Sequence, residues 1–158
     1  MTNEQRLERE TSVALLLAAL AHTGHVRDFG PDKGKSYFKT HLVRVAATVG
    51  LSARPAAALH DALECTHIGV DQMARAGISE LTRLAILLLE RDPDDSYATY
   101  IGNIAVATGP EGRIAREVKL ADLNDNLSTL PAKHPLRLRY VVAIARIARA
   151  MLPEGVEE

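Results

Sequence analysis

A histidine followed directly by an aspartate, His60 and Asp61, lies in an apolar stretch of the chain, after the Ala-Ala-Ala-Leu run at 56–59. Burying ionisable side chains is costly unless something compensates their charge. A divalent metal bound by the imidazole nitrogen and the carboxylate oxygen would do so. Neighbours on a helix point about 100° apart, so both side chains reach an ion lying between them. The alternative is a metal-free pair, hydrogen-bonded in the core or exposed on a helix surface.

Two further residues have the chemistry to complete such a site. His41 lies in an apolar helical segment upstream, and Asp122 follows the core-like pattern Val-Lys-Leu-Ala at 118–121. Together with His60 and Asp61 they would form a His-His-Asp-Asp set, which suits a divalent metal. The sequence therefore predicts one metal centre built from three separate helices.

The elements that must position these residues are all expected to be helices. Apolar periodicity, capping residues and breaks at Gly and Pro predict about seven or eight of them. Their expected ranges are 3–21, 37–49, 54–65, 70–76, 79–89, 95–108, 111–127 and 136–151. Residues 27–36 contain two glycines, a proline and two lysines, which favours a basic loop. No stretch alternates like a strand, so we expect a compact all-α bundle.

Composition indicates one domain with a core of small and branched aliphatic side chains. The 158 residues are 47% hydrophobic, only 4% are aromatic and none is Trp. That size and apolar content fit a single globular domain, in which Ala, Leu, Val and Ile must fill the core. We assign the domain to 2–152 and a short acidic tail to 153–158.

Charge, apolar runs and cysteine content limit the classes of partner. The formal net charge of −1 gives no electrostatic reason to bind nucleic acid or an anionic membrane. The longest apolar run, 13–21, is too short to cross a bilayer. A single cysteine, Cys65, cannot form a disulfide within the chain, which favours a reducing, cytoplasmic setting. We expect a small-molecule partner, and a homo-oligomer stays compatible with the sequence.

The order His41, then His60–Asp61, then Asp122 resembles the HD superfamily of metal-dependent phosphohydrolases. Within it, the chain is most similar to the hydrolase domain of RelA/SpoT proteins and to the small alarmone hydrolases. Residues 57–66 resemble the family's His-Asp-x-x-Glu-Asp-Thr helix, and 118–127 resemble its Lys-Leu-Ala-Asp-Arg-x-x-Asn segment. Further matching segments lie at 21–27, at Tyr37, at 41–46 and at Leu81-Thr82.

The resemblance implies an HD-type helical bundle that holds one divalent metal, usually manganese. Its ligands would be His41, His60, Asp61 and Asp122. Glu64 would act with Asp61 as a catalytic residue, because it is four residues after His60 and three after Asp61 on a regular helix. The implied reaction is hydrolysis of the 3′-pyrophosphate ester of guanosine tetra- or pentaphosphate (ppGpp, pppGpp).

The same resemblance implies how a nucleotide would be bound. Arg27 would contact the base, because a planar guanidinium stacks on a purine. Lys33 and Lys35 would meet the polyphosphate, and Asn126 would bond to the sugar. The alternative for Arg27 and the two lysines is a solvated loop, and for Asn126 a helix-end cap.

Three positions depart from the family pattern. Cys65 replaces the Asp of the Glu-Asp pair, Leu123 replaces the Arg after the ligand aspartate, and His25 replaces a Gln. A thiol is a poor base near neutral pH. Two alternatives to alarmone hydrolysis therefore stay open: a nucleoside mono- or triphosphate hydrolase with the same metal site, and a catalytically silent nucleotide-binding regulatory protein.

The other histidines are given structural or solvent-facing positions. His22 is expected to interact with the last carbonyls of the first helix, and lining the metal cavity is the alternative. His67 and His134 fall in turns and are expected to face solvent.

Overall fold

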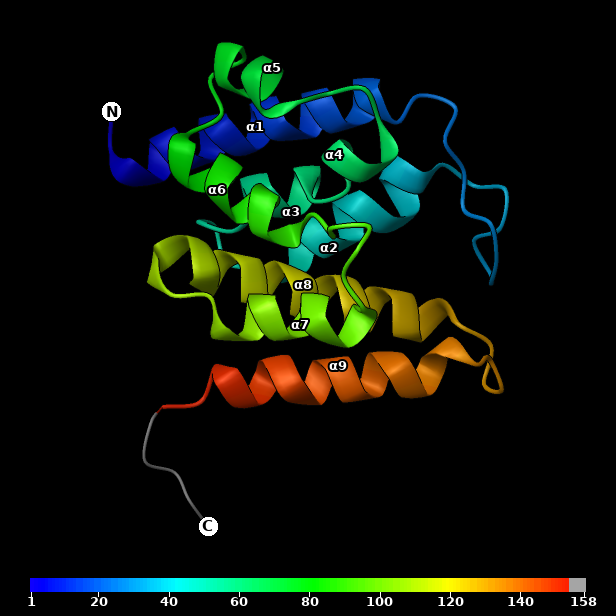
Figure 1. The fold of residues 1–158 in the computed structure, drawn as a ribbon. Helices are drawn as coiled ribbons and strands as arrows, with labels where there is room; N and C mark the ends of the chain where they lie inside the picture. The colour runs from blue at the N-terminus through cyan, green and yellow to red at the C-terminus, as the bar shows by residue number, and fades with distance from the viewer. Residues whose placement is uncertain (154–158) are drawn as a thin grey trace.

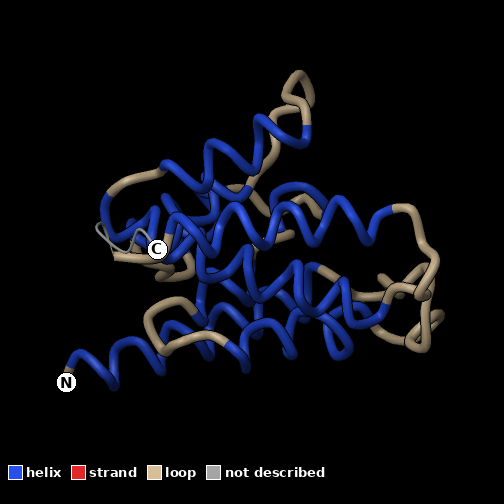
Figure 2. The backbone as a smooth tube through the Cα atoms, turned by 90° about the horizontal axis from the view of Figure 1, so that it is seen from below, coloured by secondary structure: helices blue, strands red, loops and turns tan. Residues whose placement is uncertain are grey.

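The computed structural model describes residues 1–153, and its regular elements are helical. In chain order they are α1 (Asn3–Ala21), the π-helical turn η1 (Phe38–Leu42), α2 (Val43–Thr48), α3 (Arg54–Leu59), α4 (Ala62–Cys65), α5 (Val70–Arg75), α6 (Glu80–Leu89), α7 (Tyr97–Val106), α8 (Gly109–Thr129) and α9 (Leu136–Ala150). Extended pairing within 1–153 is limited to isolated bridges in the loop after α1. The expected all-α fold is confirmed, and Figure 2 shows only helix and loop along the described chain.

Small side chains let α1 and α3 pack closely. Ala14 and Ala18 of α1 have no exposed surface, and the whole of α3 from Pro55 to Leu59 is buried. Because alanine adds little bulk beyond the backbone, two such helices approach closely and bury their shared face. Figure 1 shows α1 running across α3. This contact forms one half of the core, as the aromatic-poor composition led us to expect.

The other half consists of α7, α8 and α9, which run side by side below (Figure 1). The 21-residue helix α8 also packs against α2, α3 and α6, so it joins the two halves. α9 is fixed mainly through Ala143 and Ile147, while other apolar residues on it remain exposed. The position of α8 brings its side chains next to those of η1 and α3.

The helix predicted for 37–49 contains a wide turn that periodicity did not indicate. Residues Phe38–Leu42 form a π-helical turn, closed by the Val43 N–H bonding to the Phe38 carbonyl, and α2 continues from there. Such turns hold one more residue than an α-helical turn and occur often at functional sites. His41 lies in this turn and has no exposed surface.

The helix predicted for 54–65 is wrong as a single element. α3 ends at Leu59 and α4 begins at Ala62, with Asp61 at φ −100° and ψ 2° between them. This backbone conformation is less populated and is found at many active-site residues. His60 and Asp61 each have a partner that stabilises the break, since His60 Nδ1 lies 2.8 Å from the Ala57 carbonyl and Asp61 accepts a hydrogen bond from Tyr37.

The remaining helix boundaries agree with expectation to within two residues. The predicted helix 95–108 begins at Tyr97, because the Ser96 hydroxyl accepts the Thr99 N–H at 3.0 Å and caps it. Gly109 and Pro110, expected to separate two helices, form the first turn of α8. The assignment of one domain to 2–152 stays a prediction, and the predicted tail, apart from Pro153, lies outside the described residues.

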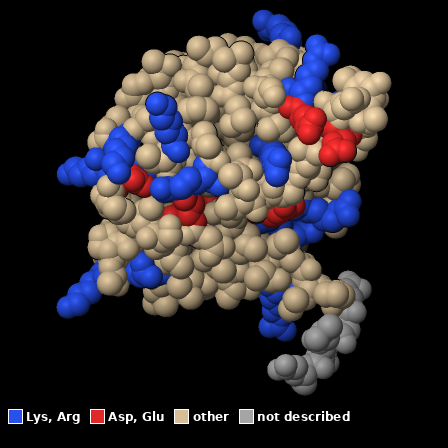
Figure 3. Space-filling view, turned by 180° about the vertical axis from the view of Figure 1, so that it is seen from behind, with Lys and Arg blue, Asp and Glu red and all other residues tan. Residues whose placement is uncertain are grey.

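The surface carries charges of both signs. Figure 3 shows one face on which Lys and Arg side chains are spread out, with Asp and Glu side chains between them. In the described part of the chain, no helix combines the length and the apolar character needed to span a membrane.

Candidate metal centre

Three buried side chains from three elements meet in the interior. His41 from η1, His60 after α3 and Asp122 from α8 each offer a ligand atom, and these atoms all lie within 4.8 Å of one another. The Asp122 Oδ1 atom is 3.3 Å from His41 Nε2 and 3.6 Å from His60 Nε2. Separations of this size fit ligands that share one ion at about 2.0–2.2 Å from each atom.

Asp61 joins the same cluster from the break between α3 and α4. Its Oδ2 atom lies 3.2 Å from His60 Nε2 and 3.7 Å from His41 Nε2, and it accepts a hydrogen bond from the Tyr37 hydroxyl. Within 1–153, the group of ligand atoms that are mutually within 4.8 Å does not include Asp61. A shared ion would therefore require a small rotation of this carboxylate. The structure thus brings His41, His60 and Asp122 together, and Asp61 lies beside them.

The donor atoms fit a divalent metal. His41 Nε2 and His60 Nε2 are both buried without a hydrogen-bond partner, whereas the Nδ1 atom of each ring is occupied. An imidazole that donates through Nδ1 presents the lone pair of Nε2, which is the usual arrangement of a metal-binding histidine. Two such nitrogens with two carboxylate oxygens suit a divalent transition metal.

Charges within the cluster perturb its ionisation. Burial alone would lower the pKa of His60, but Asp61 and Asp122 raise it well above its ordinary value. Burial alone would raise the pKa of Asp122, but Lys119 and the two histidines hold it well below its ordinary value. Without a cation, the carboxylates are thus neutralised by protonated neighbours. A metal bound at this position has to displace protons from the imidazoles.

Asp122 is held on both oxygens by its own helix. Lys119 Nζ lies 2.8 Å from Oδ2, and the Asn126 amide donates to Oδ1 at 2.6 Å. These partners are three residues before and four residues after Asp122, so all three side chains share one face of α8. The aspartate therefore has a fixed orientation toward the two histidines.

Asp125 supports the centre and was not predicted from the sequence. Its Oδ2 atom is 2.7 Å from His41 Nδ1, and its Oδ1 atom accepts from Arg44 Nε at 2.8 Å. Arg44 also donates to Asp32 at 2.7 Å, which links the centre to the loop after α1. Carboxylates behind a metal-binding histidine fix its tautomer and orientation. The available sequence signal was its position one helical turn after Asp122.

Arg27 is not the solvated loop residue that the alternative described. It is 5% exposed and donates to Thr129 Oγ1 at 2.9 Å and to Asn126 Oδ1 at 3.3 Å. Its guanidinium carbon lies 5.7 Å from the Tyr37 ring centroid and 6.0 Å from that of Phe29. Arg27 and Asn126 are thus brought together beside the metal cluster.

Lys33 and Lys35 stay at the surface of the same loop. Both are exposed, and the Lys35 ammonium lies 3.2 Å from Asp32 Oδ1. Glu64 and Cys65 are also exposed, on the short helix α4 that follows the break. Because the helix is interrupted at Asp61, regular helical spacing no longer places Glu64 relative to His60. Partial desolvation of the sulfur and the nearby Asp61 and Glu64 carboxylates raise the pKa of the Cys65 thiol to about 11.

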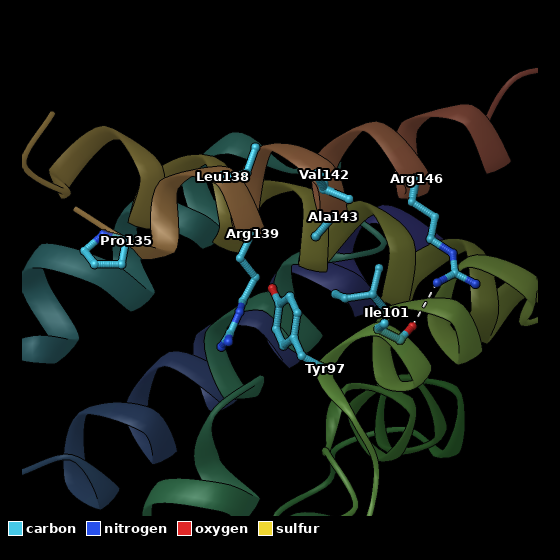
Figure 4. Close-up of a pocket in the computed structure, with 9 residues that line it drawn as sticks. Tyr97, Ile101, Pro135, Leu138, Arg139, Val142, Ala143 and Arg146 are labelled. Atoms are coloured by element: carbon cyan, nitrogen blue, oxygen red, sulfur yellow. Dashed lines mark hydrogen bonds between the residues drawn. The ribbon is translucent and has the colours of Figure 1, made fainter. Parts of the chain in front are cut away.

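Two cavities differ in their relation to the centre. A cavity of about 160 Å³ is lined by His25, Arg27, Tyr37 and Asn126 among others, and Tyr37 and Asn126 also bond to the metal-cluster aspartates. A cavity of about 500 Å³ lies between α7 and α9, with mainly apolar walls and two arginines (Figure 4). A third cavity, of about 430 Å³, reaches His41 through Asp125, whereas residues of the smallest one contact both Asp61 and Asp122. It is the better candidate for substrate binding.

Comparison with known proteins supports the fold. No protein-family model matches the chain, and no curated protein matches it by sequence. Among solved structures, it is similar to a metazoan ortholog of SpoT that hydrolyzes ppGpp and plays a role in starvation responses. The TM-score is 0.69 and the identity 19%, over 94% of this chain and 87% of that one. The chain therefore shares the helical fold of that SpoT ortholog, which agrees with the all-α bundle that the sequence predicted.

Proposed function

We propose that this protein is a metal-dependent phosphohydrolase that acts on a phosphorylated nucleotide. The observation that carries the proposal is the pair of buried, unpartnered Nε2 atoms of His41 and His60, facing the Asp61 and Asp122 carboxylates. Because buried polar atoms are rarely left without a partner, this arrangement indicates a cation site. The fold shared with a ppGpp hydrolase supports the same conclusion.

The side chains divide the chemical work between them. A divalent cation held by His41, His60, Asp61 and Asp122, with manganese as our expectation, supplies water activation and neutralisation of phosphoryl charge. Tyr37 holds Asp61 in place, and Lys119 holds Asp122. Glu64 is proposed to accept the proton of the attacking water.

The substrate is proposed to lie in the cavity beside the centre. Arg27 and Asn126 line it, so a base and a sugar placed there would contact the guanidinium and the amide. Lys33 and Lys35 project from the neighbouring loop and are free to meet a polyphosphate by charge attraction, after Lys35 leaves Asp32. The substrate we favour is ppGpp, cleaved at its 3′-pyrophosphate ester. The lone cysteine favours a cytoplasmic location.

One observation favours the two alternatives to alarmone hydrolysis. The Cys65 thiol is protonated at neutral pH, because its pKa is raised to about 11, and so it does not replace a carboxylate. A nucleoside mono- or triphosphate hydrolase, or a silent nucleotide-binding protein, would tolerate this change. In the silent case, a Cys65→Asp variant gains turnover.

Metal analysis followed by a product-release panel tests the proposal. The purified protein is loaded with Mn²⁺ and assayed for phosphate and pyrophosphate release from ppGpp, pppGpp and nucleoside mono- and triphosphates. We expect His60→Ala and Asp122→Ala to lose both bound metal and turnover, and the loop variant His134→Ala to keep both. Equal metal content in all three variants would refute the site.

A further inference from the structure

A third imidazole near the centre has the same unusual feature as the two candidate ligands. His22, directly after α1, is 2% exposed, and its Nε2 atom is buried without a hydrogen-bond partner. Within 1–153, three imidazole nitrogens are in this condition, and the other two belong to His41 and His60. A buried polar atom without a partner is uncommon and calls for one that the protein itself does not supply.

The side chain of His22 is held in place by a stack of rings. Its Nδ1 atom lies 3.0 Å from His25 Nδ1, and its ring centroid is 5.3 Å from that of His25 and 5.4 Å from that of Tyr37. The expectation that this histidine binds the last carbonyls of α1 is therefore wrong for its side chain. The contact with His25 requires a proton on one Nδ1 atom and leaves Nε2 of His22 as the free position.

The stack leads directly to the metal cluster. Tyr37 donates its hydroxyl to Asp61, and its ring centroid is 5.0 Å from that of His41. Burial lowers the pKa of His22, and the charges of Asp61, His60 and His41 also act on it. Among residues 1–153, His22 Nε2 nevertheless has no hydrogen-bond partner. The Nε2 atom of His22 is therefore open to a hydrogen bond from a water molecule.

Two nearby side chains, Cys65 and Glu64, are poorly suited to orient such a water molecule. Cys65 cannot accept a proton or a strong hydrogen bond near neutral pH, because partial desolvation raises the pKa of its thiol. Glu64 is exposed on α4 and can take up a proton, but a flexible exposed side chain fixes the direction of a water poorly. A buried imidazole that is held on its other nitrogen has the rigidity that orientation requires.

We propose that His22 is a further catalytic residue, whose Nε2 atom accepts a hydrogen bond from the attacking water and aims it at the phosphorus. His25 is a positioning residue whose Nδ1 atom accepts a hydrogen bond from the Nδ1–H of His22, which keeps the proton on Nδ1 and leaves Nε2 unprotonated. The proposal rests on the proposed function, because it assigns a task in the same hydrolysis. It also makes a statement about tautomers that holds without any substrate.

The tautomer is measured first. Two-bond ¹H–¹⁵N correlation spectra of the metal-free protein, with assignment by the His22→Gln variant, show which ring nitrogen of His22 carries the proton. In the wild-type protein we expect His22 to be in the Nδ1–H form. In His25→Leu we expect a mixture of His22 tautomers, whereas in His25→Gln we expect the Nδ1–H form to remain. A proton on Nε2 of His22 in the wild-type protein would overturn the proposal.

Kinetics and spectroscopy of the loaded protein form the second test. In His22→Phe, which keeps a stacking ring, we expect kcat to fall about 100-fold with unchanged KM and Mn²⁺ content. Adding imidazole to His22→Ala restores part of the lost rate. Electron–nuclear double resonance of the Mn²⁺-loaded protein in H₂O and D₂O shows changed couplings of exchangeable protons in His22→Phe, while the exposed control His67→Phe matches wild type.

These experiments distinguish failure of the proposed function from failure of the role assigned to His22. A wild-type protein without turnover on any nucleotide refutes the proposed function, whereas the tautomer and the proton couplings still decide the role of His22. A His22→Phe variant that is only less heat-stable, with wild-type kcat and couplings, gives His22 a structural role and refutes the inference.

Discussion

Replacing Asp125 with asparagine should weaken metal binding although Asp125 is not a ligand. The wild-type carboxylate lies 2.7 Å from His41 Nδ1, so it fixes the tautomer in which Nε2 faces the cluster. Asparagine keeps an acceptor oxygen but carries no charge, and its amide group can turn a donor toward the ring instead. Changes to such supporting groups cost about 10–100-fold in metal affinity, which is about 1.4–2.8 kcal/mol.

We expect Asp125→Asn to lower the affinity for Mn²⁺ about tenfold and Asp125→Ala to lower it about 100-fold, because alanine also removes the hydrogen-bond acceptor. Arg44 retains its contact with Asp32 at 2.7 Å in both variants, which limits wider rearrangement. Mn²⁺ affinity is measured by titration calorimetry at fixed pH and ionic strength. Asp71→Asn is the control, since it removes the same charge from an exposed position on α5. Equal affinity in Asp125→Asn and Asp71→Asn would refute the reasoning.

Three further predictions concern other parts of the molecule. Glu10→Ala should lower the free energy of unfolding, measured by urea titration, by about 1.5–3 kcal/mol. The reason is that one buried carboxylate oxygen of Glu10 accepts three hydrogen bonds from Ser79 and Thr82. The control Glu8→Ala, at an exposed position, should change the free energy of unfolding little. Ala57→Leu, at a position with no exposed surface, should cost about 1–3 kcal/mol by overpacking, read from the same titrations. Iodoacetamide should alkylate Cys65 at pH 8 about tenfold more slowly than a thiol of pKa 9, because its pKa is about 11 and the smaller thiolate fraction is partly offset by the greater nucleophilicity of the more basic thiolate. A rate equal to that of a cysteine peptide would contradict this.

The candidate metal ligands could be picked out from the sequence because each is an ionisable residue in an apolar pattern. His41, His60 and Asp122 interrupt stretches that otherwise read as core, and all three are buried. Asp125 could not be found in this way, since it lies between two asparagines in a polar stretch of α8. Its inward contact depends on His41, which is 84 residues away.

Local pattern also failed where distant contacts decide the backbone. The run of alanines before His60 favours an uninterrupted helix, yet the chain breaks at Asp61, where Tyr37 bonds to the carboxylate from 24 residues away. Arg27 is a similar case. Its place in a glycine-containing loop left a solvated position open as the alternative, but Thr129, 102 residues later, accepts its hydrogen bond and Arg27 is buried.

The wide turn at Phe38–Leu42 changes the angular position of the helix that follows it relative to the residues that precede it. With one residue more than an ordinary turn, it advances the following helix by about 100° relative to the segment before it. Tyr37 can thereby reach Asp61 while Val45 still packs in the core. Deleting a single residue in this turn would rotate either the Tyr37 contact or the Val45 contact out of place, even if every side chain were kept. Length, as much as residue type, is therefore under constraint in this segment.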